Sequence, residues 1–120
     1  MDDAQVLTTT AVFKALSDPN RLRIFAELMQ GDSCNCELKE TLNLAPNLLS
    51  HHLRALSDAG LVQSRRDVVD GRWIYYAVDR EKMAGWHAWI AAFFDPARIA
   101  SRPVCGPEGQ AAATSSGCAS

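Results

Sequence analysis

The sequence predicts a mainly α-helical domain with a β-hairpin wing, which is a winged helix-turn-helix fold. Two short helical patterns flank a tight turn at residues 43–45, and two strand-like segments then flank the dipeptide Asp70-Gly71. A chain of 120 residues suffices for one hydrophobic core. We therefore expect one folded domain over residues 1–98 and a flexible tail over residues 99–120, where small residues, Pro and Gly replace core-forming ones.

Helix signals recur along the first 60 residues. A mostly apolar, uncapped first helix is expected from about Ala4 to Ala15, and it is typical of a packing or dimerisation helix. Asp18 followed by Pro19 predicts the start of a second helix, which we expect to end at Gly31. The helix-turn-helix itself is expected at residues 34–42 and 46–58, with Gly60 just beyond its last turn.

The remaining elements follow from alternation and from helical spacing. Residues 61–66 and 72–78 are strand-like, and the turn between them makes them a hairpin. A last helix is expected over about residues 80–94, with a broad apolar face that needs a partner. That face is formed by Met83, Trp86, Ile90 and Phe93.

Composition limits the class of protein. No apolar run approaches the roughly 20 residues that cross a bilayer, and the N-terminus is acidic, so we expect a cytoplasmic protein with no membrane partner. The net charge of -2 weighs against tight nonspecific nucleic-acid binding.

Because the cytosol is reducing, clustered thiols there favour metal or redox sites over structural disulfides. The four cysteines are Cys34, Cys36, Cys105 and Cys118.

One face of the helix at residues 46–58 is suited to reading DNA. Leu49, Leu53 and Leu56 lie on one side, and short or planar hydrogen-bonding groups occupy the other. This second set is Asn47, Ser50, His51 and Arg54. His52 falls on the apolar stripe, so we expect it to pack. In the hairpin, Arg65, Arg66 and Arg72 suit phosphates or a minor groove, although exposed arginines are also ordinary in hairpins.

Four sequence strings resemble the ArsR/SmtB family of metal-sensing bacterial repressors. They are LSDPNRLRI at residues 16–24, SHHLRAL at 50–56, AGLV at 59–62 and GRWIYY at 71–76. The resemblance implies a homodimer built on the first and last helices, which binds an imperfect inverted repeat in operator DNA and releases it when an inducer binds. It also implies DNA contacts at Asn47, Ser50 and His51, in agreement with the helical face.

Cys34 and Cys36 are candidate ligands for a soft ion. Thiolates select soft acceptors over Ca²⁺ or Mg²⁺, and exposed N–H groups at a helix start favour the thiolate form. Residues two apart in a helix point to nearly opposite sides, so one ion on both sulfurs requires an irregular or unwound first turn. Remodelling that turn would disturb the neighbouring DNA-reading helix and release the DNA.

The resemblance implies As(III) or Sb(III) as the inducer, with no organic cofactor. Arsenic sensors of the family carry a third cysteine one turn onward, where this chain has Lys39. The site is therefore expected to be two-coordinate, or to be completed by Cys105 or, second, by Cys118. The family's zinc sensors use paired aspartates and histidines on the last helix. Here that helix offers only His87 after Asp79, and no zinc site is predicted.

Three alternatives stay open. The same fold could sense Cd or Pb, or it could sense a redox or persulfide signal through disulfide chemistry at the thiols. A thiol-metal chaperone or adaptor that never binds DNA is favoured only by the acidic pI of about 5.8. An enzyme is not predicted, because the sequence contains no nucleophile-base constellation and no phosphate-cradling glycine loop.

Overall fold

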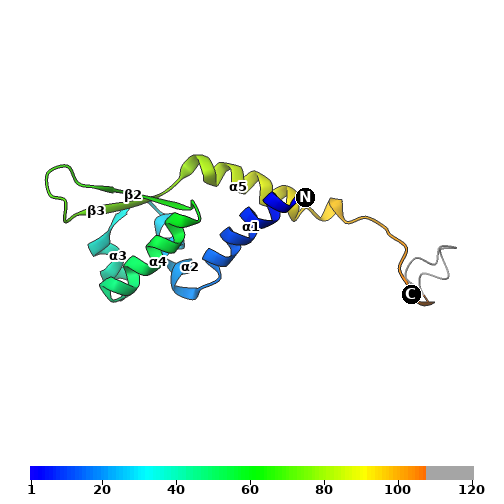
Figure 1. Cartoon of the computed structure of the whole chain (residues 1–120), viewed down its shortest axis with the longest axis horizontal. Coiled ribbons are helices and arrows are strands. Elements are labelled where there is room, and N and C mark those ends of the chain that lie inside the picture. The colour runs from blue at the N-terminus through cyan, green and yellow to red at the C-terminus, as the bar shows by residue number, and fades with distance from the viewer. Residues whose placement is uncertain (108–120) are drawn as a thin grey trace. The chain divides into compact units, whose positions relative to one another are not determined.

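The computed structural model describes residues 1–107. It divides into two compact units, Met1–His87 and Ala88–Ser120, which are described separately. The division expected at residue 98 stays a prediction. In chain order the elements are α1 (Asp3–Leu16), α2 (Pro19–Leu28), β1 (Ser33–Cys34), α3 (Asn35–Leu42), α4 (Pro46–Asp58), β2 (Val62–Arg66), β3 (Ile74–Val78), α5 (Arg80–Phe93) and the 3-10 helix η1 (Pro96–Arg98) (Figure 1). The predicted fold class, mainly α with a β-hairpin wing, is confirmed.

The first two helices are fixed by aspartate caps. In α1 the Asp2 carboxylate accepts from Gln5 N at 2.8 Å, and the Gln5 side chain accepts from Asp2 N at 3.0 Å. The expectation of an uncapped first helix is therefore wrong, because this reciprocal pair lies before the apolar run that predicted the helix. The Asp18 cap of α2 is confirmed. Helix α2 ends at Leu28, before the expected stop at Gly31, which has a φ of 142°.

The sheet contains one strand that the sequence did not predict. Its order is β1-β3-β2, with all pairs antiparallel. Strand β1 comprises only Ser33 and Cys34, which pair with Tyr76 and Tyr75 of β3. Two residues are too few to show an alternating pattern. As a result α3 begins at Asn35, one residue later than expected, and Cys34 is its N-cap.

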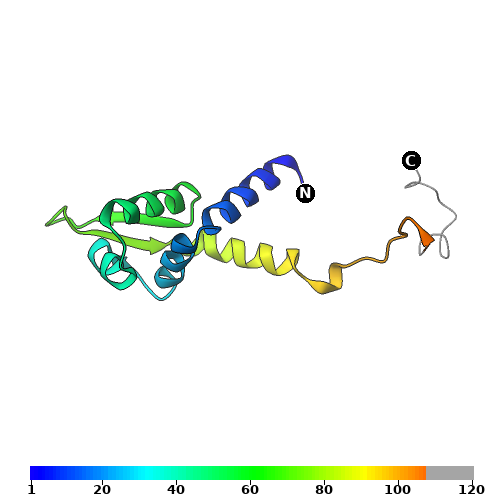
Figure 2. The same ribbon diagram turned by 90° about the horizontal axis from the view of Figure 1, so that it is seen from below.

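The hairpin of β2 and β3 extends beyond α3 and α4 as the wing (Figures 1 and 2). The predicted turn at Asp70-Gly71 is confirmed, because Trp73 N donates to Asp70 O at 3.1 Å. Asp67 orders the rest of the connection by accepting from Val69 N at 3.0 Å and Asp70 N at 2.9 Å. Gly71 does not adopt a positive φ, so this turn does not use the left-handed region that its glycine permits.

The core of the first unit lies among α1, α2, α3, α4 and the strand that leads into the wing. Four of its side chains are completely or almost completely buried: Ile24, Leu38, Leu56 and Leu61. Each comes from a different element or from the turn after α4, so these residues fix the mutual positions of the helix-turn-helix and α2.

In the second unit, Trp89 and Phe93 stack with ring centroids 4.7 Å apart, and η1 is capped by Asp95. Within residues 1–107, none of the helices combines the length and apolar character that a membrane span needs. The expected tail begins in this unit at residue 99, and residues 108–120 are outside the described part of the chain.

The core predicts a contrast between two leucines of α4. Leu56 is fully buried, whereas Leu48 is 40% exposed. Leu56→Ala should lower the free energy of unfolding by about 2–5 kcal/mol, because it removes buried methyl groups and leaves a cavity. Leu48→Ala should cost less than about 1 kcal/mol. Urea unfolding of both variants measures the difference, and equal losses would contradict this core.

Candidate functional site

Helix α4 presents the predicted polar face to solvent. Asn47, Ser50, His51 and Arg54 are all exposed. Leu49, His52, Leu53 and Leu56 are buried on the opposite side. The structure thus places the four candidate DNA-contacting residues of α4 together on one open helix face. Their contacts with bases stay a prediction.

His52 anchors α4 to the start of α2. Its side chain is 5% exposed, which confirms the packing role expected for it. Arg21 Nη1 lies 3.4 Å from His52 Nδ1, and Asp18 Oδ1 lies 3.9 Å from His52 Nε2. Arg21 also donates from Nε to Ala15 O at 2.6 Å. One guanidinium therefore connects the end of α1, the start of α2 and the inner face of α4.

The Asp18 carboxylate is held ionised by its surroundings. Its pKa is lowered chiefly by the hydrogen bond from Arg21 N, and less by the bond from Asn20 N and by the charges of His52 and Arg21. Partial burial opposes this shift. The backbone donors belong to the first turn of α2, where unpaired N–H groups favour a negative charge.

The wing arginines are largely engaged within the hairpin. Arg72 forms an ion pair with Asp70 at 2.8 Å, which lowers the pKa of that carboxyl. Arg66 Nη1 donates to Gly71 O at 2.7 Å. The Arg65 guanidinium lies 4.5 Å from the centroid of the Tyr75 ring. Sequence reasoning missed the pairing of Arg72, although an aspartate two residues away was a visible signal.

The two candidate thiols differ in environment. Cys34 is 5% exposed, and its Sγ accepts from Glu37 N at 3.4 Å as the N-cap of α3. Cys36, in the first turn of α3, is exposed. It lines a cavity of about 150 Å³ whose opposite wall includes Ser50 and Leu53 of α4. Both thiols are free, and the exposed one lies beside the candidate DNA-reading helix.

A third ligand is not in place beside this pair. Among residues 1–107, no three side chains of His, Cys, Asp or Glu are grouped so that they could hold a metal ion. Lys39 is exposed. Cys105 is disulfide-bonded, and Cys118 lies outside the described residues. Of the four candidate ligands, Cys34 and Cys36 are therefore the two that are free in the described part of the chain, at the start of α3.

Comparison with known proteins identifies the family. The model for bacterial regulatory proteins of the ArsR family matches residues 18–64. The arsenical resistance operon repressor of Bacillus subtilis is 40% identical over 74 residues, which cover 61% of this chain and 68% of that protein. This chain belongs to the ArsR family. The resemblance stated from the sequence is thereby confirmed, and so is the expectation that the protein is not an enzyme, because its relatives are regulators.

Other members match over similar segments. The arsenic resistance regulator ArsR1 of Pseudomonas putida is 37% identical over 64% of this chain and 59% of its own length. A homologue of the cadmium resistance regulator CadC from Staphylococcus aureus is 37% identical over 58% of this chain and 56% of its own length. The chain therefore matches little more than half the length of these two relatives.

Solved structures share the fold. The homodimeric winged helix-turn-helix DNA-binding domain from Mycobacterium bovis matches with a TM-score of 0.62 and 28% identity, over 79% of this chain and 88% of that one. HlyU from Vibrio cholerae matches with a TM-score of 0.63 and 22% identity, over 78% and 98% of the two chains. At this identity the second match shows the fold alone.

The anchoring of Asp18 predicts a pH dependence of stability. Since its pKa lies below the ordinary value of 3.8 in the folded protein, its ionised form stabilises the fold above about pH 4, and this stabilisation is lost as the pH falls through the lowered pKa. Asp18→Asn should therefore lose less stability between pH 7 and acid pH than the parent.

Urea unfolding at both pH values measures this effect. Asp58→Asn is the matched control, because the Asp58 side chain is exposed on α4 and forms no hydrogen bond or ion pair within residues 1–107. If Asp18→Asn loses as much free energy of unfolding between pH 7 and acid pH as the parent does, the carboxylate does not anchor the folded state.

Proposed function

We propose that this ArsR-family protein is a cytoplasmic transcriptional repressor that binds operator DNA as a homodimer and dissociates when a thiophilic ion binds its cysteines. The observation that carries the proposal is the position of the free Cys34 and Cys36 at the start of α3, next to the open polar face of α4. The names of the related arsenic resistance regulators favour As(III) or Sb(III) as the inducer.

The DNA-reading role rests on α4 and the wing. Asn47, Ser50, His51 and Arg54 have the lengths and hydrogen-bonding groups that reach base edges or phosphates in a major groove. Arg65 and Arg66 lie on β2 of the hairpin and suit the adjacent phosphates. Arg72 contributes less, because Asp70 already compensates its charge. These local cations make operator binding compatible with the net charge of -2.

Dimerisation is supported by apolar surface on α1. Leu7 is 72% exposed, and Val6 and Phe13 are each more than 40% exposed. Exposed apolar side chains on one helix are costly to leave in water. The Mycobacterium bovis neighbour is a homodimer. A two-fold dimer presents two copies of α4, so its operator is expected to be an imperfect inverted repeat.

Release follows from the double role of Cys34. In this proposal its sulfur turns away from the Glu37 N–H to share one ion with Cys36, and that N–H loses its acceptor at the start of α3. The same residue pairs with Tyr75 of the wing. Movement of Cys34 therefore disturbs both α3 and β3, and Cys36 transmits the change to the cavity wall that includes Ser50.

A third thiolate would complete the coordination that trivalent arsenic prefers. Cys105 is the first candidate and Cys118 the second, from either subunit. Since Cys105 is disulfide-bonded in the structure, its use as a ligand requires prior reduction of that bond. The pair at α3 is the primary site in this proposal, and the third sulfur adds affinity.

The reading face predicts the effect of a double substitution. Ser50→Ala with His51→Ala should weaken operator binding by about tenfold to a hundredfold, since a good base contact contributes about 1–3 kcal/mol. Fluorescence anisotropy with labelled operator measures this change. His87→Ala, a histidine substitution on α5, is the control and should leave affinity unchanged. If the double variant keeps full operator affinity, the residues that read the bases do not lie on this face of α4.

The thiol pair predicts loss of induction without loss of DNA binding. Cys36→Ser, and separately Cys34→Ser, should bind operator like the parent but stay bound when arsenite is added under full reduction, because one thiolate alone binds the ion weakly. Serine also serves as an N-cap, so the second substitution preserves the start of α3. Retained release in both variants would exclude the pair as the primary site.

The same titration separates the alternatives. The relative from Staphylococcus aureus named for cadmium resistance favours Cd²⁺ as a second candidate inducer. Release by arsenite in the presence of reductant supports the metalloid. Release only by Cd²⁺ or Pb²⁺ would show that one of these ions is the inducer. Release only by an oxidant or a persulfide donor would show that the protein senses sulfur oxidation at its thiols. A protein that binds no DNA at any salt concentration would be a thiol-metal adaptor.

A further inference from the structure

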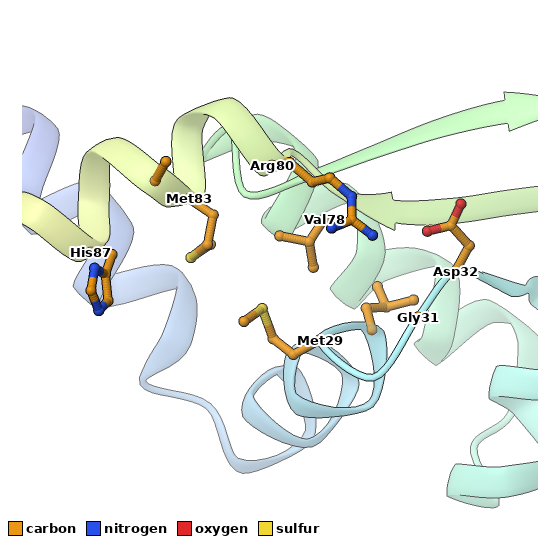
Figure 3. Close-up of a pocket in the computed structure, with 9 residues that line it drawn as sticks. Met29, Gly31, Asp32, Val78, Arg80, Met83 and His87 are labelled. Atoms are coloured by element: carbon orange, nitrogen blue, oxygen red, sulfur yellow. The ribbon is translucent and has the colours of Figure 1, made fainter.

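A second cavity lies in the first unit, between the end of α2, the end of β3 and the start of α5. Its volume is about 390 Å³. Leu28 and Val78 are among its apolar lining residues, whereas Asp32 and Arg80 lie on one side of it (Figure 3). The proposed repressor function uses none of these residues.

Three soft or borderline donors line this cavity. Met29 is the C-cap residue of α2, and Met83 and His87 lie on α5. Figure 3 shows the Met29 and Met83 side chains reaching toward one another across the cavity, with His87 one turn further along α5. Because Met83 and His87 are four residues apart in a helix, their Cβ atoms lie about 5–6 Å apart on one face.

We propose that this cavity is a binding site for a soft monovalent cation, Cu⁺ or its analogue Ag⁺, held by the sulfurs of Met29 and Met83 and the imidazole of His87. Thioethers select Cu⁺ among biological metals, and imidazole is compatible with it. Zn²⁺ prefers a tetrahedral set of thiolate, imidazole and carboxylate ligands, and of these the cavity lining offers only His87 and Asp32. The site is thus chemically distinct from the thiol pair.

The donors are available for a ligand. Met29 is 53% exposed, and three rotatable bonds let each methionine sulfur move toward an ion. The His87 side chain takes part in no hydrogen bond, ion pair or ring contact within residues 1–107, so its ring nitrogens are not engaged. Asp32 supplies one negative charge on the cavity lining and Arg80 one positive charge. This balance suits a singly charged ion better than a divalent one.

A bound cation would connect α2 to α5. At its other end, α2 is preceded by Asp18 and begins with the turn that holds Arg21, and both side chains contact His52 of α4. An ion that binds only the folded protein also stabilises the folded state by mass action. The cavity would therefore give the protein a metal response that is independent of Cys34 and Cys36.

Methionine methyl NMR tests this proposal with an internal control. The chain has three methionines, and Met1 is the one outside the cavity. A full-length variant with all four cysteines replaced by serine removes the competing thiols. Titration with silver nitrate in chloride-free buffer should shift the ¹³C-methyl signals of Met29 and Met83, saturating near one equivalent, and leave Met1 unchanged. In the parent protein the same shifts should follow after the thiols are filled.

Substitutions test the ligand set. Met29→Leu and Met83→Leu keep the side-chain volume and should each weaken Ag⁺ binding by about tenfold or more, as should His87→Gln. His51→Gln is the matched control and should bind like the parent. The proposal is overturned if Met1 shifts together with the other methionines, if no methyl signal shifts, or if all three cavity substitutions leave the affinity unchanged. DNA binding and arsenite release are measured separately and do not affect this outcome.

Discussion

The hydrogen bond from Glu37 N to the Cys34 sulfur is the contact on which the candidate switch depends. It caps α3 with a group that is itself a soft-metal ligand, so the atom that would bind an ion also holds the helix start. Cys34 further belongs to β1, which pairs with β3 of the wing. A change at one sulfur therefore reaches both the helix-turn-helix and the hairpin.

The helix that would read DNA is held by different contacts. Arg21 bonds to the Ala15 carbonyl and approaches His52 on the inner face of α4, while Leu56 fills the core beneath that helix. These interactions leave the outer face of α4 polar and exposed. Leu38 of α3 shares this core with Leu56, so the proposed switch rearranges only the start of α3 and keeps the core that folds both helices.

Periodicity and cap residues predicted most of the fold, because the long apolar patterns and the Asp18-Pro19 start are local signals. The α4 face could be predicted for the same reason. Strand β1 could not, since two residues have no period and their pairing depends on distant Tyr75 and Tyr76. The sequence therefore placed Cys34 inside a helix, although it is a buried cap. The partner of Arg72 and the soft-donor cavity also depend on tertiary contacts that spacing alone does not reveal.

Amide hydrogen exchange at Glu37 tests the central claim most directly, because that N–H is the group that loses its partner when the sulfur moves. It is measured on the reduced protein with and without one equivalent of arsenite, with the Leu56 amide in the last turn of α4 as the internal reference. The account predicts faster exchange at Glu37 in the arsenite-bound protein and unchanged exchange at Leu56. Undiminished protection of Glu37 while arsenite is bound would contradict it.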